Sequence, residues 1–128
     1  MRVLLDTHLL LWSMASSRRL PKEVRSLILD EANEVFYSAA SVWEVAIKSA
    51  LRRRDFRANP TVLVRALAHS GFSELPVTAA HAARVAGLPP IHRDPFDRLL
   101  VAQSLAEPLT LLTNDAALVR YGPLVQLV

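Results

Sequence analysis

The chain opens with the stretch Arg2-Val3-Leu4-Leu5-Asp6-Thr7-His8-Leu9-Leu10-Leu11-Trp12. Its first residues are typical of a short buried strand, and the segment that follows has the apolar content of a helix. Asp6 stands between the two, at the carboxyl end of the strand. In an open parallel sheet that edge is where ligands bind. The opening therefore predicts an α/β fold with an acid at its functional edge.

The same alternation of strand and helix patterns continues along the chain. Strands are expected at residues 2–5, 35–38, 72–77, 109–113 and 124–128. Helices are expected at residues 8–15, 21–32, 39–53, 60–70, 79–86, 95–106 and 116–121. Such alternation is the signature of crossover units and a largely parallel sheet. We therefore expect one three-layer α/β domain over residues 1–128.

Composition limits the chemistry. The chain has 128 residues, of which 52% are hydrophobic, so it can bury a core unaided. It contains no cysteine, so any metal would be held by oxygen or imidazole ligands. The apolar run 9–12 is far too short to span a membrane or to serve as a signal-peptide core. We expect a cytoplasmic protein without membrane attachment.

The charge pattern fits a polyanionic ligand. The net charge is +3, but setting aside Asp6, Glu44, Asp97 and Asp115 leaves 15 basic residues against 8 acidic ones. A basic surface around an acidic pocket suits a nucleic acid whose phosphate meets a bound cation. Thirteen of the basic residues are Arg, however, and a bias in genome composition explains that equally well.

Four acids stand at or near predicted helix starts, where ordinary helix chemistry also accounts for them. Asp6 and Asp115 each follow a strand and have the position of a helix N-cap. Asp94 is the expected cap of the helix at residues 95–106, with Pro95 at its first position, and Asp97 lies in the first turn, where the helix dipole favours an acid. Glu44 completes a capping box with Ser41 or pairs with Lys48, although it also borders the apolar stripe of its helix.

The combination of the four acids indicates more than capping. Acids at the starts of successive crossover helices gather at one edge of the sheet, where their mutual repulsion raises pKa values unless a cation neutralises them. Mg2+ is the expected cation, with Mn2+ as a substitute, because both prefer oxygen ligands. A metal-bound water would then attack a phosphodiester.

At this point the sequence resembles the PIN-domain nucleases, and most closely the toxin ribonucleases (VapC type) of type II toxin–antitoxin pairs. The resemblance spans the whole chain in order and spacing. It is carried by Leu4-Leu5-Asp6-Thr7-His8, Ser41-Val42-Trp43-Glu44-Val45-Ala46-Ile47-Lys48, His92-Arg93-Asp94-Pro95-Phe96-Asp97-Arg98 and Leu112-Thr113-Asn114-Asp115.

The resemblance implies a five-stranded parallel sheet flanked by helices and the hydrolysis of RNA. It assigns metal binding and catalysis to Asp6, Glu44, Asp97 and Asp115, with Thr113 orienting a carboxylate or water. It further implies a homodimer and a cognate antitoxin, through which alone the complex would bind operator DNA. Whether Asp94 joins the site is left open.

Other side chains have a functional and a structural interpretation. Lys48, Arg52 and Arg53 begin a basic group, with Arg54 and Arg57, that would contact the RNA backbone or form a solvated helix end. Arg98 would touch substrate or form a surface ion pair. Trp12, Trp43 and Phe96 are interpreted as core residues rather than stacking faces for bases. His92 lies near the third acid, and no histidine is assigned to metal.

Two other functions compete with the leading one. A PIN-fold nuclease of RNA processing would carry the same four acids, and a non-catalytic module would bind RNA or protein with the same fold. A receiver or phosphatase is disfavoured, since position 8, where a phosphatase would have a second Asp, is His8. The sequence does not specify which RNA is cut or how many metal ions act.

Overall fold

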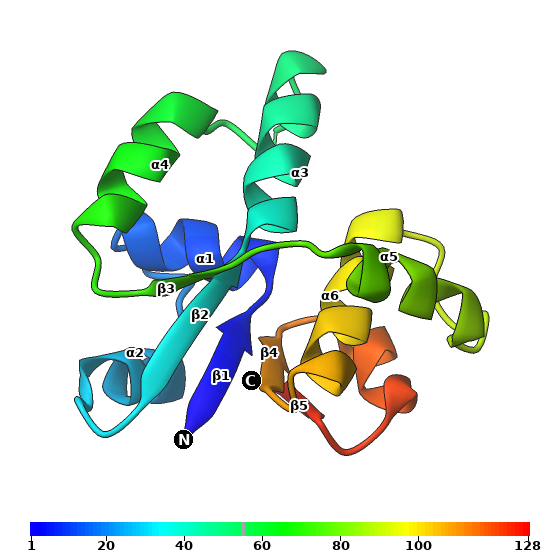
Figure 1. Ribbon diagram of the computed structural model, residues 1–128. Helices are drawn as coiled ribbons and strands as arrows, with labels where there is room; N and C mark the ends of the chain where they lie inside the picture. The colour runs from blue at the N-terminus through cyan, green and yellow to red at the C-terminus, as the bar shows by residue number, and fades with distance from the viewer. Residues whose placement is uncertain (55) are drawn as a thin grey trace.

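A five-stranded sheet forms the centre of the protein. The computed structural model describes residues 1–54 and 56–128. The strands are β1 (Arg2–Leu5), β2 (Glu34–Ser38), β3 (Ser73–Leu75), β4 (Thr110–Thr113) and β5 (Val125–Leu127). The helices are α1 (Thr7–Met14), α2 (Lys22–Leu29), α3 (Ala39–Ala50), α4 (Pro60–Ala68), α5 (Ala79–Arg84) and α6 (Pro95–Ala106), with 3-10 helices η1 (Val85–Gly87) and η2 (Ala116–Tyr121) (Figure 1).

The sheet has the order β3-β2-β1-β4-β5, and every neighbouring pair is parallel. This confirms the predicted parallel sheet flanked by helices. The first strand is central, with Leu4 beside Phe36 of β2 and Leu5 beside Leu112 of β4. Burial of β1 on both faces explains why Val3, Leu4 and Leu5 are all apolar.

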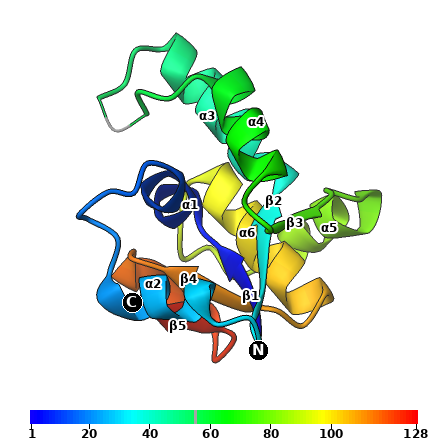
Figure 2. The ribbon, with the colours of Figure 1, turned by 90° about the vertical axis from the view of Figure 1, so that its left-hand side faces the viewer.

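Two apolar cores lie on opposite faces of the sheet. On one face, Val3 and Leu5 of β1 pack with residues of α1, α2, α3 and α4. On the other, Leu4 packs with Leu100 of α6 and Leu118 of η2. Alternate residues of a strand point to opposite faces, so the single run in β1 serves both cores. Figure 2 shows α3 and α4 side by side, projecting beyond the sheet.

Three helix starts carry the Asp caps that the sequence predicts. Asp6 caps α1 through Leu9 N, Asp94 caps α6 and Asp115 caps η2. The capping box at Ser41 is wrong, because α3 begins earlier and is capped by Ser38. The helix expected to reach residue 53 ends at Ala50. Within the described residues, no helix has the length and apolar character needed to cross a membrane.

Candidate active site

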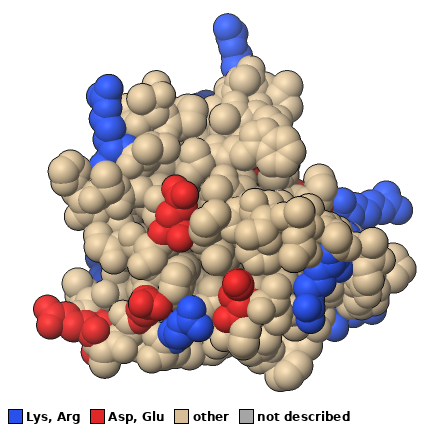
Figure 3. Space-filling model, viewed as in Figure 1, with Lys and Arg blue, Asp and Glu red and all other residues tan. Residues whose placement is uncertain are grey.

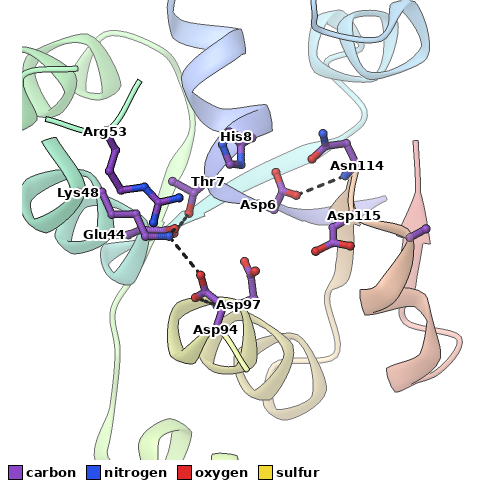
Figure 4. Close-up of a pocket in the computed structure, with 11 residues that line it drawn as sticks. Asp6, Thr7, His8, Glu44, Lys48, Arg53, Asp94, Asp97, Asn114 and Asp115 are labelled. Atoms are coloured by element: carbon purple, nitrogen blue, oxygen red, sulfur yellow. Dashed lines mark hydrogen bonds and ion pairs between the residues drawn. The ribbon is translucent and has the colours of Figure 1, made fainter. Parts of the chain in front are cut away.

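A cleft of about 390 Å³ opens at the carboxyl ends of β1 and β4. The four predicted acids meet in it, although they come from four separate parts of the chain. Its walls are formed by Asp6, Thr7, His8, Glu44, Lys48, Arg53, Asp94, Asp97, Asn114, Asp115 and Ala116. In Figure 4 the carboxylates of Asp6, Asp97 and Asp115 point toward a common space, while Glu44 lies to one side with Lys48.

Asp6 is buried and held by three donors. Its Oδ1 accepts from Leu9 N at 2.9 Å, and its Oδ2 accepts from Thr113 Oγ1 at 2.6 Å and Asn114 N at 3.3 Å. Burial raises the pKa of the Asp6 carboxyl, against the effect of these hydrogen bonds. Thr113 thus lies where it can fix the orientation of Asp6 between β1 and β4.

Glu44 is buried and already paired with protein groups. Thr7 Oγ1 donates to its Oε1 at 2.6 Å, and Lys48 Nζ lies 2.6 Å from its Oε2. The same ammonium lies 3.1 Å from Asp94 Oδ2. Burial tends to raise the pKa of Asp94, but the Asp97 N–H and Lys48 outweigh it, so the pKa is lowered overall. Lys48 is therefore a built-in counter-ion for two acids.

Asp97 differs from the other acids of the cleft. Across residues 1–54 and 56–128, no group donates a hydrogen bond to its carboxylate, and His92 Nε2 is 3.7 Å away. Burial raises its pKa to about 7, with further contributions from the charges of Asp94, Glu44 and Asp6. Asp97 is the residue at which the negative charge of the cleft is least compensated.

Asp115 forms the last wall of the site. Its Oδ1 accepts from Ala117 N at 3.0 Å, and its Oδ2 lies 2.9 Å from His92 Nε2. One ligand atom from each of His92, Asp97 and Asp115 lies within 4.8 Å of the others. The sequence placed His92 near the third acid, which the structure confirms, and the structure adds its contact with Asp115.

The cleft has the chemistry of a site for a hard divalent cation. Oxygen atoms of Asp6, Asp97 and Asp115 face one another, and the raised pKa of Asp97 marks charge that the protein does not balance. Carboxylates in this arrangement suit Mg2+ or Mn2+. The residues therefore fit the metal that the sequence predicts.

The sequence pattern of the PIN domain matches residues 3–123 of this chain. The matched range runs from β1 through β4 and η2 and ends just before β5, and it contains the four acids of the cleft. The chain belongs to the PIN domain family. No curated protein sequence matches it.

Solved structures show the same PIN fold. VapBC2 from Rickettsia felis, bound to a DNA fragment from its promoter, aligns with a TM-score of 0.70 at 16% identity, covering 100% of this chain and 98% of the other. DNA-bound VapBC from Salmonella typhimurium gives 0.66 at 15%, covering 100% and 97%. FitAcB from Neisseria gonorrhoeae gives 0.62 at 23%, covering 92% and 90%. Identities this low show the fold alone.

In this PIN domain, the residues predicted to contact RNA fall into two groups, one inside the cleft and one outside it. Lys48 and Arg53 line the cleft, whereas Arg52 and Arg98 do not. The Arg98 guanidinium instead donates to Pro89 O at 2.9 Å and Val85 O at 3.1 Å, which ties down the loop before α6. On the face viewed in Figure 3, basic side chains stand apart with acids between them, so that face lacks a continuous basic surface.

One aromatic prediction is wrong. Trp43, interpreted as a core residue, is 58% exposed on α3. Its ring meets the edge of Phe96, with 5.1 Å between centroids. With Ile47 and Leu51 it forms an exposed apolar stripe along α3. Trp12 does pack against the core, as predicted.

The structure also adds residues that the sequence analysis did not select. Thr7, His8 and Asn114 line the cleft, and each lies within two residues of a strand-end acid. Thr7 contacts Glu44, and the His8 ring packs on Phe56 with 5.0 Å between centroids. Their closeness in the sequence to Asp6 or Asp115 was the signal that could have identified them.

Proposed function

We propose that this PIN domain is a metal-dependent endoribonuclease, the toxin of a type II toxin–antitoxin pair in the cytoplasm. The observation that carries the proposal is the state of Asp97. Its carboxylate lacks a hydrogen-bond donor within the described residues, and its pKa is raised to about 7 by burial and neighbouring acids. A cation bound in the cleft would hold this group ionised at neutral pH.

The cleft residues divide into ligands and supports. Asp6, Asp97 and Asp115 would hold Mg2+, or Mn2+ in its place, with Glu44 as the fourth acid. When bound, such an ion supplies a water of lowered pKa and stabilises charge on a phosphodiester in hydrolysis. Thr113 would fix Asp6 through its 2.6 Å hydrogen bond. Lys48 would keep the charge of Glu44 balanced, and Arg53 at the rim would contact a backbone phosphate.

The test is cleavage of a mixed, fluorescently labelled RNA pool with Mg2+, with Mn2+ and with chelator. Asp97→Asn keeps the size of the side chain and removes its charge, and Glu31→Gln removes an exposed acid outside the cleft. We expect metal-dependent cutting by the wild type and Glu31→Gln, and a loss of roughly 100-fold or more in Asp97→Asn. Cleavage by Asp97→Asn at the wild-type rate, or cleavage by the wild type in chelator, would refute this mechanism.

A matched single-stranded DNA pool determines the substrate class. Cutting of RNA alone agrees with the proposal, whereas equal cutting of both pools would contradict its ribonuclease part. If RNA is bound but never cut under any metal condition, the non-catalytic RNA-binding module becomes the better interpretation.

The proposal includes a protein partner. Trp43 and Ile47 of α3 and its C-cap Leu51 lie at i, i+4 and i+8, with 58%, 37% and 68% of their surfaces exposed. Contiguous apolar surface of this kind is typical of a protein contact. Solved structures with a similar fold include VapBC complexes. We propose that a cognate antitoxin covers this stripe and the neighbouring cleft, and that operator DNA is bound through the antitoxin.

Co-expression with the protein encoded by the adjacent reading frame tests the partner. A stable complex that no longer cuts RNA, and that Leu51→Glu weakens, would support it. Failure of the two proteins to associate would contradict the toxin–antitoxin part and favour an RNA-processing nuclease. Light scattering of the PIN domain alone tests the homodimer.

A further inference from the structure

His92 lies between two acids of the proposed metal site. Its Nε2 is 2.9 Å from Asp115 Oδ2 and 3.7 Å from Asp97 Oδ2. An imidazole beside two carboxylates has the composition of a site for a transition metal. The alternative is that the imidazole donates a hydrogen bond to a ligand and does not touch the ion. The other ring nitrogen decides between the two.

The hydrogen bonds of His92 fix which ring nitrogen bears the proton. The backbone N–H of Asp94 donates to His92 Nδ1 at 3.1 Å. A ring nitrogen that accepts a hydrogen bond bears no proton, so in the neutral ring the proton is on Nε2. Nε2–H then donates to Asp115 and offers no lone pair to a metal. Ligation through Nε2 would move the proton to Nδ1, against the N–H of Asp94.

The backbone that carries His92 is clamped from outside the cleft. His92 N donates to the Tyr121 hydroxyl at 3.0 Å, and that oxygen also accepts from Arg98 Nη1 at 3.1 Å. Arg98 in turn holds the carbonyls of Pro89 and Val85. Neither Arg98 nor Tyr121 lines the cleft. Together they hold the backbone of His92, whose imidazole contacts Asp115.

We propose that His92 is a positioning residue, a hydrogen-bond donor locked in one tautomer that orients Asp115 for the metal. Arg98 and Tyr121 hold it in place. The inference rests on the metal site of the proposed function and deepens it. Because His92 is a donor, the site offers the ion oxygen ligands only. It should therefore favour Mg2+ and gain no selective affinity for Zn2+ from an imidazole.

The tautomer is measured directly by long-range 1H–15N NMR of the full chain, with the His92 signals identified by their absence in His92→Gln. We expect the proton on Nε2 in metal-free protein and at saturating Mg2+. A proton found on Nδ1, or one that moves there when Mg2+ is added, would overturn the inference and make His92 a ligand.

Calorimetric titration with Mg2+, without RNA, tests the positioning role. His92→Ala should weaken binding about tenfold, and His92→Gln, whose amide N–H can replace the Nε2–H donor, should restore most of it. Tyr121→Phe should cause a smaller loss that is not additive with His92→Ala. Unchanged affinity in His92→Ala would overturn the role.

The same titrations distinguish this inference from the proposed function. If the wild type binds no Mg2+, the metal site fails and the positioning role fails with it. If the wild type binds Mg2+ and Asp97→Asn does not, the metal site is supported. The Mg2+ affinities of the His92 variants then test the positioning role of His92 separately.

Discussion

Each acid of the cleft is stabilised to a different degree. Asp6 accepts three hydrogen bonds, Glu44 is paired with Thr7 and Lys48, and Asp115 accepts from Ala117 N and lies against His92. Asp97 receives none from the described residues. Five acids line one small cleft, and burial and the neighbouring charges raise the pKa of the carboxyl with the fewest hydrogen bonds to about 7.

The raised pKa of Asp97 predicts an unusual dependence of stability on pH. Its pKa is about 7 in the folded protein against 3.8 for an ordinary Asp, so between these values the folded state retains a proton that the unfolded state has lost. Metal-free stability attributable to Asp97 is therefore present at low pH and decreases as pH rises toward 7. Between pH 5 and 8 the loss is on the order of 2 kcal/mol.

Thermal unfolding in chelator, compared between wild type and Asp97→Asn, isolates this effect. As pH rises from 5 to 8, the Tm of Asp97→Asn should rise relative to that of the wild type. Repeating the comparison with Mg2+ in place of chelator should reduce this relative change. Parallel Tm curves for the two proteins across this range would show that Asp97 has an ordinary pKa.

The acids could be found from the sequence, whereas the roles of their neighbours could not. Asp6 and Asp115 follow strands, and that junction fixes their place in a parallel sheet. Arg98 follows Asp97 directly, but successive helical residues point about 100° apart, so adjacency does not put it in the cleft. Trp43 was wrongly interpreted as a core residue, because an apolar residue on an amphipathic helix is not always on its buried side.

Lys48 joins two helices that contribute acids to the cleft. It lies on α3, and its ammonium bridges Glu44 of the same helix and Asp94 at the start of α6. Its Nζ is also 4.7 Å from the centroid of the Phe56 ring. Glu44 is only 3% exposed, so without Lys48 its charge would be buried among other acids.

Lys48→Met should therefore lower the free energy of unfolding by about 3 kcal/mol, because it leaves a buried carboxylate without its counter-ion. Urea unfolding measures the loss. Adding Glu44→Gln to Lys48→Met should recover much of it, and Mg2+ should stabilise Lys48→Met more than the wild type. If Lys48→Met were as stable as the wild type, the ion pair between Lys48 and Glu44 would not contribute to the stability of the fold.

The end of α3 stores a small strain that can be removed. Arg52 has φ of 55°, while Arg52 N donates to Ser49 O and Arg53 N to Lys48 O. This is the Schellman arrangement, whose left-handed position usually holds Gly. Arg52→Gly should stabilise the fold by about 1 kcal/mol.

Thermal unfolding of Arg52→Gly measures this gain. The control is Arg54→Gly, at a neighbouring position whose φ is not positive. The control should gain nothing, since it adds freedom to the unfolded chain without relieving strain. Equal changes in Tm for the two variants would contradict the assignment.

Element types were more predictable than element ends. All five strands were found because short apolar runs are bounded by turn residues, and α6 agrees at both ends because Asp94-Pro95 marks its start. The start of α3 at Ala39 agrees with the prediction, but the capping box at Ser41 was wrong because Ser38 and Ser41 are both competent caps. Only the end of β2 at Ser38 decides between them, and that depends on pairing with distant strands.

For the whole molecule, the position of the cleft determines which basic residues could contact the proposed RNA substrate. Arg53 lines the cleft and Arg52, its neighbour, does not. Arg53→Glu should therefore weaken RNA binding more than Arg52→Glu, and it should reduce the slope of log K against log salt by about 0.7 per lost contact with a single strand. Fluorescence anisotropy in an Asp97→Asn background measures binding without cleavage. Equal effects of the two variants would show that RNA binding depends on the overall positive charge and not on a contact with Arg53.

The sheet order has a consequence for how the protein is made. The central strand β1 is synthesised first, yet its two neighbours are β2 and the much later β4. The hydrogen bond from Thr113 to Asp6 joins residues 107 positions apart. A nascent chain still on the ribosome therefore carries Asp6 and Glu44 without the strand that completes the cleft. The proposed ribonuclease would therefore be harmless to the ribosome and message that produce it until β4 has been synthesised and has joined the sheet.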